Sequence, residues 1–452
     1  MIFITIVIGA TILVLLWLIR RAKDQAETSE QQSEVLSSAQ SENGSESKES
    51  SQKVKTEATA EQKKKKGNQQ AKRNPNTHQQ FTHPQLITTL KGHSGLVTSG
   101  DFSANGRHFI SAAEDRIVLF WSTKEFGQKS QQSVRGNIEF DHATKVCWSP
   151  DSKAFIIQAA TANCIQVYKL TKNSTGGLGT PSLALTFPQH SAEADVIALG
   201  FAVSGRFIMT LNSRSQLVIW DLRGNILEEM DVRHGDTYHA QLSTCGRFII
   251  TSGFTPDAKV WEVKFNKSGN YEGIKRAFIL SGHTSGIYSS TVNADSSRMA
   301  TVSKDGSWRL YDTKIEYDKG QSPYLLLSGK YERKETPGII KLSPDSRTIA
   351  IAAHNDIYCY SAINGEQLNY IHNIYEGSIV DVLFDPSSKF LLTLGDKHIR
   401  VFHNVAGYMA ALQDLEQSRL KASNAGMRER IDGQIQEAKL ALQQIQQITA
   451  LE

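Results

Sequence analysis

The stretch that decides the fold is residues 281–313, SGHTSGIYSSTVNADSSRMATVSKDGSWRLYDT. It contains a Gly-His pair, an apolar segment of strand length, a polar turn, a second such segment, the turn Lys-Asp-Gly, and a third segment that ends in Tyr-Asp. Polar side chains taken out of water need hydrogen-bond partners, so the polar residues of this unit are predicted to form one buried chain of hydrogen bonds. The residues expected in that chain are His283, Thr301, Asp305 and Tyr311.

The same pattern recurs in residues 91–122, with 22 residues from His to Asp and 6 from Asp to the closing aromatic in both copies. The matching residues are His93, Ser111, Asp115 and Trp121. Two copies this far apart indicate a repeat architecture.

Strands that end in an aromatic residue return seven times between residues 84 and 404. The closing residues are Trp121, Tyr168, Trp220, Trp261, Tyr311, Tyr360 and Phe402. Each is preceded by a polar turn and an apolar segment, and the mean spacing of about 47 residues suits four short antiparallel strands per unit. The sequence therefore predicts an all-β, seven-bladed β-propeller over residues 84–404.

Residues 84–90, PQLITTL, precede the first complete repeat and have no blade of their own. We expect them to supply the outer strand of the last blade, which closes the ring and removes an open edge. Outside the first and fifth blades the buried polar chain is expected to be incomplete, so that those blades depend more on apolar packing. The residues in place of the turn Asp are Ala162, Arg214, Thr255 and His354.

Residues 2–19, IFITIVIGATILVLLWLI, carry no charge and are long enough to cross most of a bilayer core, so residues 1–20 are predicted to be a membrane anchor. A cleaved signal peptide is the alternative, but no basic region precedes the apolar run and no clear A-x-A site follows it. Arg20, Arg21 and Lys23 follow directly, and the positive-inside rule then keeps the rest of the chain in the cytosol. Under this topology the sequons at Asn43, Asn173 and Asn266 stay unglycosylated.

Residues 21–83 are rich in Ser, Gln, Glu and Lys and are predicted to be a disordered basic linker. Its densest cluster of cations consists of Lys63, Lys64, Lys65, Lys66, Lys72 and Arg73. This cluster suits a nuclear address, contact with anionic lipid, contact with RNA phosphates, or a solvated linker without a partner.

Residues 405–452 consist largely of good helix formers and are predicted to form a helical hairpin interrupted at residues 424–426. Two apolar stripes favour packing of the hairpin on itself or on the propeller flank, with dimerisation as the alternative.

The chain shows no phosphate loop, H-E-x-x-H, G-x-S-x-G, EF-hand series or CxxC pair, so we expect no catalytic site, cofactor or metal. An enzyme with its site on the central channel would need a cluster of inward carboxylates or histidines, and the sequence offers no obvious set. The net charge of +4 gives no global basic field. The scattered Cys147, Cys164, Cys245 and Cys359 suit buried reduced thiols.

The turns between the second and third strands of all blades open on one face of a propeller. Arg214, Phe254, Lys304 and His354 are therefore expected on one rim, as a partner-binding face with an aromatic beside cations. The alternative for Phe254 is that it packs under Pro256.

The Gly-His, turn-Asp and Trp-Asp pattern resembles that of the WD-repeat family. Trp220-Asp221 has the literal dipeptide, while Trp121-Ser122, Trp261-Glu262 and Tyr311-Asp312 are variants. The whole chain resembles one membrane-anchored branch of that family. This resemblance implies an endoplasmic-reticulum membrane protein whose propeller binds other proteins, including a stress kinase of the PERK type, with an RNA-binding or translation-associated adaptor as the alternative.

Overall fold

The computed structural model of the protein describes residues 81–128, 130–173, 177–189 and 194–450, with side chains described to residue 445. The predicted membrane anchor and nearly all of the predicted basic linker lie outside these residues. Within them, no helix is both long and apolar enough to span a bilayer.

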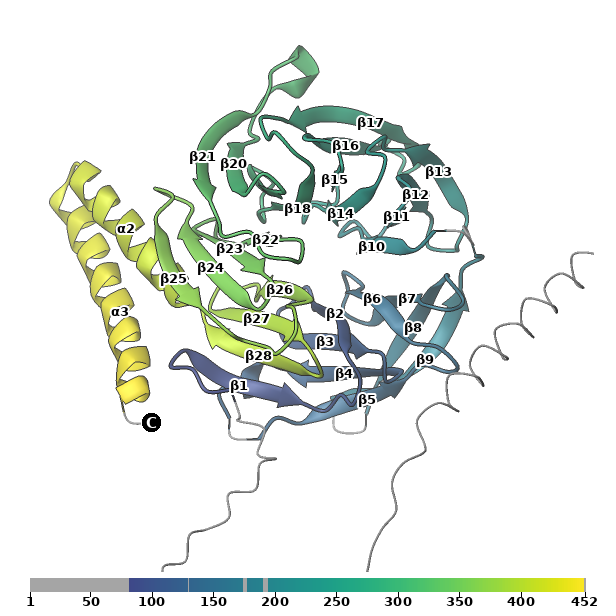
Figure 1. Ribbon diagram of the computed structural model, residues 1–452, viewed down its shortest axis with the longest axis horizontal. Helices are drawn as coiled ribbons and strands as arrows, with labels where there is room; N and C mark the ends of the chain where they lie inside the picture. The colour runs from purple at the N-terminus through teal and green to yellow at the C-terminus, as the bar shows by residue number, and fades with distance from the viewer. Residues whose placement is uncertain (1–80, 129, 174–176, 190–193, 451–452) are drawn as a thin grey trace, which may run out of the picture. The chain divides into compact units, whose positions relative to one another are not determined.

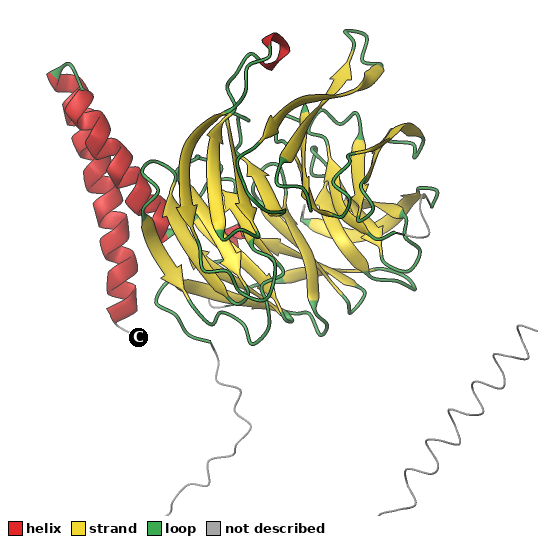
Figure 2. Ribbon diagram, turned by 45° about the horizontal axis from the view of Figure 1, so that its top comes forward, coloured by secondary structure: helices red, strands yellow, loops and turns green. Residues whose placement is uncertain are grey.

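Seven four-stranded antiparallel sheets are arranged around a central axis (Figures 1 and 2). Blades one and two comprise β2 (Val97–Phe102), β3 (His108–Ala113), β4 (Ile117–Ser122) and β5 (Ser133–Asn137), then β6 (Ala143–Trp148), β7 (Ala154–Ala159), β8 (Ile165–Lys172) and β9 (Leu178–Thr186). Blades three and four comprise β10 (Val196–Phe201), β11 (Ile208–Asn212), β12 (Gln216–Trp220) and β13 (Ile226–Asp231), then β14 (Thr237–Leu242), β15 (Phe248–Gly253), β16 (Ala258–Phe265) and β17 (Tyr271–Leu280).

Blades five and six comprise β18 (Ile287–Val292), β19 (Arg298–Ser303), β20 (Ser307–Asp312) and β21 (Tyr324–Lys330), then β22 (Ile339–Leu342), β23 (Thr348–Ala353), β24 (Asp356–Ser361) and β25 (Gln367–Ile371). The seventh comprises β26 (Asp381–Phe384), β27 (Phe390–Gly395), β28 (His398–His403) and, from the other end of the propeller, β1 (Leu86–Lys91). Two single-turn 3-10 helices, η1 (Thr123–Glu125) and η2 (Tyr317–Lys319), lie in loops. The predicted seven-bladed fold is confirmed.

The ring closes as predicted, because β1 pairs antiparallel with β28 from Leu86 opposite Phe402 to Lys91 opposite His398. Leu90 of β1 is 1% exposed and packs among the buried residues shared by the first and last blades. The closing strand therefore adds apolar core as well as backbone hydrogen bonds.

The turn between the first and second strands has the same backbone in every blade. Its third residue adopts the left-handed conformation, with φ between 57° and 69° at Gly106, Ser152, Gly205, Gly246, Ser296, Ser346 and Ser388. Glycine reaches this region without strain, whereas serine has a hydroxyl to offer. The Ser346 hydroxyl accepts a hydrogen bond from Asn293 Nδ2 at 2.7 Å, and that of Ser388 accepts one from the Asp345 amide at 3.2 Å. These serines link neighbouring blades.

Innermost strands have one edge without a strand partner, and side chains of the preceding blade satisfy amides on that edge. The Ser99 hydroxyl accepts from the Val146 amide at 3.2 Å, and the Asp101 carboxylate accepts from the Trp148 amide at 2.7 Å. The Thr291 hydroxyl likewise accepts from the Leu342 amide at 3.3 Å. Polar residues on the innermost strands therefore join successive blades.

Two helices follow the propeller, α2 (Val405–Lys421) and α3 (Ala425–Ala450); α2 lies against the sixth blade and α3 packs on α2 (Figure 1). Asn404 caps α2 by accepting from the Gly407 amide at 3.0 Å. Ile431 and Ile435 of α3 are buried against α2, and Arg347 of the sixth blade pairs with Asp414 at 3.1 Å. The hairpin thus packs on itself and on the propeller flank.

The predicted interruption of the hairpin was placed slightly too late. Residues 422–424 separate the helices, and Gly426 lies in the first turn of α3. The reason is that the Asn424 side chain accepts from the Met427 amide at 2.7 Å and so starts the second helix.

Candidate protein-interaction face

The first blade holds a continuous buried hydrogen-bonded chain. Trp121 Nε1 donates to the Ser111 hydroxyl at 3.0 Å, and that hydroxyl lies 2.8 Å from His93 Nε2. His93 Nδ1 lies 3.2 Å from the Asp115 carboxylate, which also accepts from the Ser94 amide at 2.8 Å. The structure brings all four predicted residues together and connects the third strand to the loop before the first.

The fifth blade repeats this arrangement with one difference. His283 lies 2.8 Å from the Thr301 hydroxyl and 3.0 Å from the Asp305 carboxylate. The Tyr311 hydroxyl donates to the Ser281 carbonyl at 2.8 Å, so it bonds the loop rather than extending the side-chain series as Trp121 does. The phenol oxygen lies outside its ring, whereas the indole nitrogen is a ring atom, so the Tyr311 hydroxyl extends far enough to bond the loop carbonyl.

A third chain lies in the fourth blade, where the sequence predicted an incomplete one. Trp261 Nε1 donates to the Thr251 hydroxyl at 3.0 Å, which lies 2.9 Å from His234 Nε2. His234 Nδ1 meets the Thr255 hydroxyl at 2.6 Å, so Thr255 takes the part of the turn Asp. The prediction that this blade lacks the chain was therefore wrong, because a hydroxyl satisfies the imidazole as well as a carboxylate does. The detectable signal was the separation of 17 residues between His234 and Thr251, against 18 in the other two blades.

Burial and hydrogen bonding shift the titration of these residues in opposite directions. Burial lowers the pKa of His93 and His283, and burial together with Lys259 lowers the pKa of His234 to about 4. Burial would raise the pKa of Asp305, but hydrogen bonds from Ser307 and Thr284 outweigh it and lower the pKa to about 2. At neutral pH the histidines are therefore neutral and the turn aspartate is charged.

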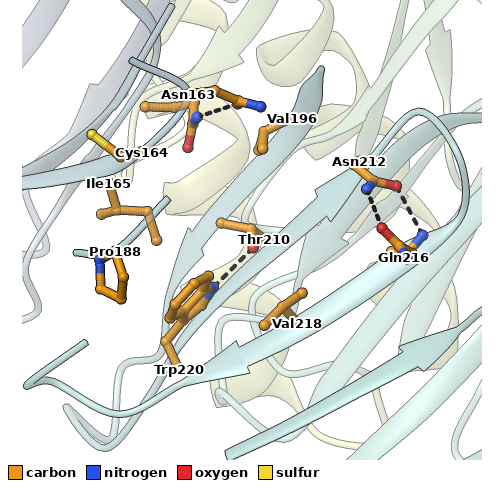
Figure 3. Close-up of a pocket in the computed structure, with 11 residues that line it drawn as sticks. Asn163, Cys164, Ile165, Pro188, Val196, Thr210, Asn212, Gln216, Val218 and Trp220 are labelled. Atoms are coloured by element: carbon orange, nitrogen blue, oxygen red, sulfur yellow. Dashed lines mark hydrogen bonds between the residues drawn. The ribbon is translucent and has the colours of Figure 1, made fainter. Parts of the chain in front are cut away.

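The third blade keeps only part of the chain. Trp220 Nε1 donates to the Thr210 hydroxyl at 2.9 Å, and a cavity of about 20 Å³ lies beside this pair (Figure 3). That volume has room for about one water molecule. Gln158, Asn163, Asn212 and Gln216 supply its polar lining. A site of this size and uncharged character suits a structural water better than a ligand.

The four residues predicted to share a rim occupy equivalent turns of blades three to six. Arg214 follows β11, Phe254 follows β15, Lys304 follows β19, and His354 follows β23. Antiparallel pairing puts these turns at the same end of their sheets as the start of each innermost strand. We call this end of the propeller the turn face. Arg214, Phe254 and Lys304 are exposed, and His354 is half-buried.

Main-chain hydrogen bonds hold the turns of this face in place. The Phe254 amide donates to the Asp236 carbonyl at 2.8 Å, and the Lys304 amide donates to the Gly286 carbonyl at 2.9 Å. The Phe254 side chain is nonetheless 66% exposed, so it does not pack under Pro256. A fixed backbone that presents an exposed aromatic is typical of binding surfaces.

Further large apolar side chains are exposed at the turn face and were missed by the sequence analysis. They lie in loops before the innermost strands or at the strand starts: Leu96 (53% exposed), Phe140 (92%), Tyr238 (39%) and Val380 (40%). Each belongs to a different blade, and no pattern of spacing connects them in the sequence. Phe140 also has a φ of 61°, unusual for an aromatic residue, which turns its side chain outward.

On the opposite end of the fourth blade, Arg247 is one of several partly exposed cations around the buried carboxylate of Glu262. Its guanidinium binds the Glu262 carboxylate, which is 2% exposed and lies 2.9 Å from the Tyr317 hydroxyl. Lys264 and Lys275 stand 3.7 and 3.6 Å from the same carboxylate. Arg247 is therefore structural and would be a poor control site for binding experiments.

The cysteines are all free thiols: Cys164 and Cys359 are buried, Cys147 is half-buried and Cys245 is exposed, contrary to the expectation that all four are buried. Across the described part of the chain, no group of three or more His, Cys, Asp or Glu side chains is placed to hold a metal ion.

Comparison with known proteins agrees with this architecture. The family model for the WD domain, G-beta repeat, matches residues 84–122 and 274–312, which contain the chains centred on His93 and His283. Transducin beta-like protein 2 of Mus musculus is 40% identical over 384 residues, covering 85% of this chain and 87% of the relative. The protein of that name from Homo sapiens is 39% identical over 376 residues, covering 83% and 84%. Pre-mRNA-processing factor 19 homolog 2 of Arabidopsis thaliana is more distant, at 24% identity over 237 residues, 51% of this chain and 42% of the relative. A seven-bladed WD-repeat propeller with this extent of identity places the chain in the transducin beta-like protein 2 family.

Proposed function

We propose that this protein is a membrane-anchored scaffold that binds another protein through the turn face of its propeller. Residues 2–19 anchor it in the endoplasmic-reticulum membrane, the propeller faces the cytosol, and the bound protein is a stress kinase of the PERK type. The observation that carries the binding function is the exposed Phe254 on a turn fixed by the Asp236 carbonyl.

An exposed aromatic side chain leaves a large apolar surface in contact with water, which is unfavourable unless a partner covers it. Phe254 needs little further ordering on binding, because its backbone is already fixed and its side chain has only two rotatable bonds. Arg214 and Lys304, on the turns to either side, add cations that orient an acidic partner. These features favour a protein partner over a small molecule.

The test is a double substitution, Phe254→Ala with Arg214→Glu, in the full-length protein. Losing a central aromatic contact and reversing one charge is expected to weaken capture of the cytosolic region of a PERK-type kinase by at least tenfold. The matched control is Leu222→Ala with Arg223→Glu, a pair of exposed residues in the loop after β12, on the opposite end of the third blade. Both variants should unfold at the wild-type temperature. Full capture by the first variant, or loss only in the control, would refute binding at the turn face.

An RNA-binding or translation-associated adaptor is the second candidate, and it is favoured by the basic cluster between Lys63 and Arg73. Replacing its six cations by serine should then abolish crosslinking to RNA and the salt dependence of binding, while kinase capture is unchanged. RNA crosslinking that survives the replacement would eliminate this candidate.

A further inference from the structure

Six titratable side chains from five innermost strands surround the axis of the propeller. They are Asp101 of β2, Lys145 and Cys147 of β6, His239 of β14, Lys341 of β22 and Asp381 of β26. Lys145, His239 and Asp381 occupy equivalent positions on their innermost strands, each opposite the next-to-last residue of the second strand. Lys341 Nζ lies 3.4 Å from Asp381 and interacts electrostatically with both Lys145 and His239. We call this set the axial cluster. It escaped the sequence analysis because each strand contributes only one or two members, and roughly forty to fifty residues separate one blade from the next.

The carboxylates of the axial cluster are already occupied. Asp381 Oδ1 lies 3.4 Å from Lys341 Nζ and accepts from the Val382 amide at 2.8 Å. Asp101 accepts from the Trp148 and Phe102 amides at 2.7 and 2.9 Å. Both acids are thus held by the main chain at fixed positions, and only one of them pairs with a lysine.

Lys145 is the exception in the cluster. Its ammonium group makes no hydrogen bond or ion pair with any residue that the structure describes, although the residue is half-buried. Burial, and secondarily the nearby Lys341, lowers its pKa against the opposing effect of Asp381. Removing an ammonium from water without an anionic partner costs free energy, so the protein retains a cation here that its own side chains do not neutralise.

His239 supplies a donor at the same place. Its Nδ1 accepts a hydrogen bond from the Ser290 amide at 3.5 Å, and burial keeps the ring neutral by lowering its pKa well below the usual value. A neutral imidazole whose Nδ1 accepts carries its proton on Nε2. The ring therefore offers one N–H in addition to the two ammonium groups.

From this arrangement we propose that the propeller axis binds one small oxyanion, a phosphate or carboxylate group, through Lys145, Lys341 and His239 Nε2. Two lysines and a neutral imidazole donate only, so they select an acceptor with several oxygens. Asp381 pairs with Lys341, so the positive charge of Lys145 is the one left to attract a bound anion. This site is separate from the turn-face residues of the proposed function, and either proposal can fail without the other.

The experiment is thermal unfolding of the purified full-length protein in sodium phosphate or sodium acetate, compared with sodium chloride at equal ionic strength. Binding to the folded state should raise the unfolding temperature of the wild type by about 2 °C when the anion concentration is about ten times its dissociation constant. Lys145→Met keeps the length of the side chain and removes its charge. It should abolish the rise, and in chloride it should unfold at or above the wild-type temperature, because an unpaired buried charge has been removed.

Lys314→Met, at an exposed position after β20, is the control and should respond to phosphate as the wild type does. An equal rise in Lys145→Met, or no rise in the wild type with either anion, would overturn the proposal. Mass spectrometry of molecules released from the denatured protein then separates the sources of the anion. A stoichiometric phosphate or carboxylate compound released from wild type and not from Lys145→Met identifies a free ligand. Release of none, with the phosphate effect intact, shows that the site binds an oxyanion that does not co-purify with the protein.

Discussion

Asp305 is a turn residue whose carboxylate holds several parts of the fifth blade together. Its carboxylate accepts from the Thr284 amide at 3.0 Å and from the Ser307 amide at 2.8 Å, and it lies 3.0 Å from His283 Nδ1. Loop, turn and strand therefore meet on one side chain that is 13% exposed. The acidic side chain of Asp318, in contrast, is 62% exposed and pairs with Lys275 at 2.6 Å.

We expect Asp305→Ala to lower the free energy of unfolding by about 2 to 4 kcal/mol, because several buried donors lose their acceptor. Asp318→Ala should change it far less, since it removes only a surface ion pair. Thermal or urea unfolding of both variants provides the comparison. Equal effects would show that the fifth-blade chain contributes little to stability.

His234 makes stability depend on pH with a definite sign. Its pKa in the folded protein is about 4, below the 6.5 of an unperturbed histidine, so the unfolded chain binds the proton more tightly. The stabilisation is complete above pH 6.5 and is lost as the pH falls towards 4; between pH 7 and 5 it amounts to about 2 kcal/mol. His234→Gln should remove this part of the pH dependence of the unfolding free energy. His142→Gln, at a partly exposed position, should keep it, and identical pH profiles for wild type and His234→Gln would contradict the assignment.

At the level of single residues, the sequence predicted the chains around His93 and His283 but missed the one around His234. The first two contain a Gly-His pair and a turn Asp, and both features are recognisable in the sequence. The third follows Arg-His and uses Thr255, which is equivalent in hydrogen bonding although not in sequence. The axial cluster was invisible for a related reason, since its members meet only once the ring is closed.

Among the elements, strands and turns were the most predictable. Every turn between first and second strands carries Gly or Ser at its left-handed position, and these residues mark where one apolar segment ends and the next begins. The break between α2 and α3 was less predictable. Gly426 suggested an end to the helix, but the capping side chain of Asn424 decides where α3 begins.

The closing strand provides a test at this scale. Leu90→Lys places a charge in the core shared by blades one and seven, so we expect a loss of about 3 to 5 kcal/mol and faster proteolysis near β1 and β28. Lys91→Ala alters an exposed neighbour on the same strand and should unfold as the wild type does. Limited proteolysis with mass spectrometry locates the first cleavage. Wild-type resistance of Leu90→Lys would show that closure does not depend on this strand.

For the whole molecule, the seven-fold repeat determined the architecture, because a unit of four strands buries its two faces only against neighbours. The binding surface was harder to predict from the sequence than the architecture. Phe254 was identifiable from its turn, but Phe140 and Tyr238 were not, because exposure depends on how seven loops of unequal length pack around the ring.

Topology is the prediction that belongs to the whole chain. With Arg20, Arg21 and Lys23 directly after the apolar run, protease added outside sealed microsomes should digest the propeller, and Asn173 should carry no glycan. Asn173 is exposed beside β8, so its position would not prevent modification in the lumen. Protection of the propeller together with a glycan on Asn173 would reverse the proposed orientation.

The position of β1 also determines how the propeller bears mechanical load. The chain that leads to residues 2–19 enters the propeller directly through β1, so tension on the amino-terminal segment is transmitted first to the pairing between β1 and β28. Peeling off this one strand opens the ring and exposes the edge of β28, while blades one to six keep all their own strands. A protein pulled from this end should therefore yield by ring opening before any blade unravels. The force at which it yields should fall in Leu90→Lys and stay unchanged in Phe254→Ala.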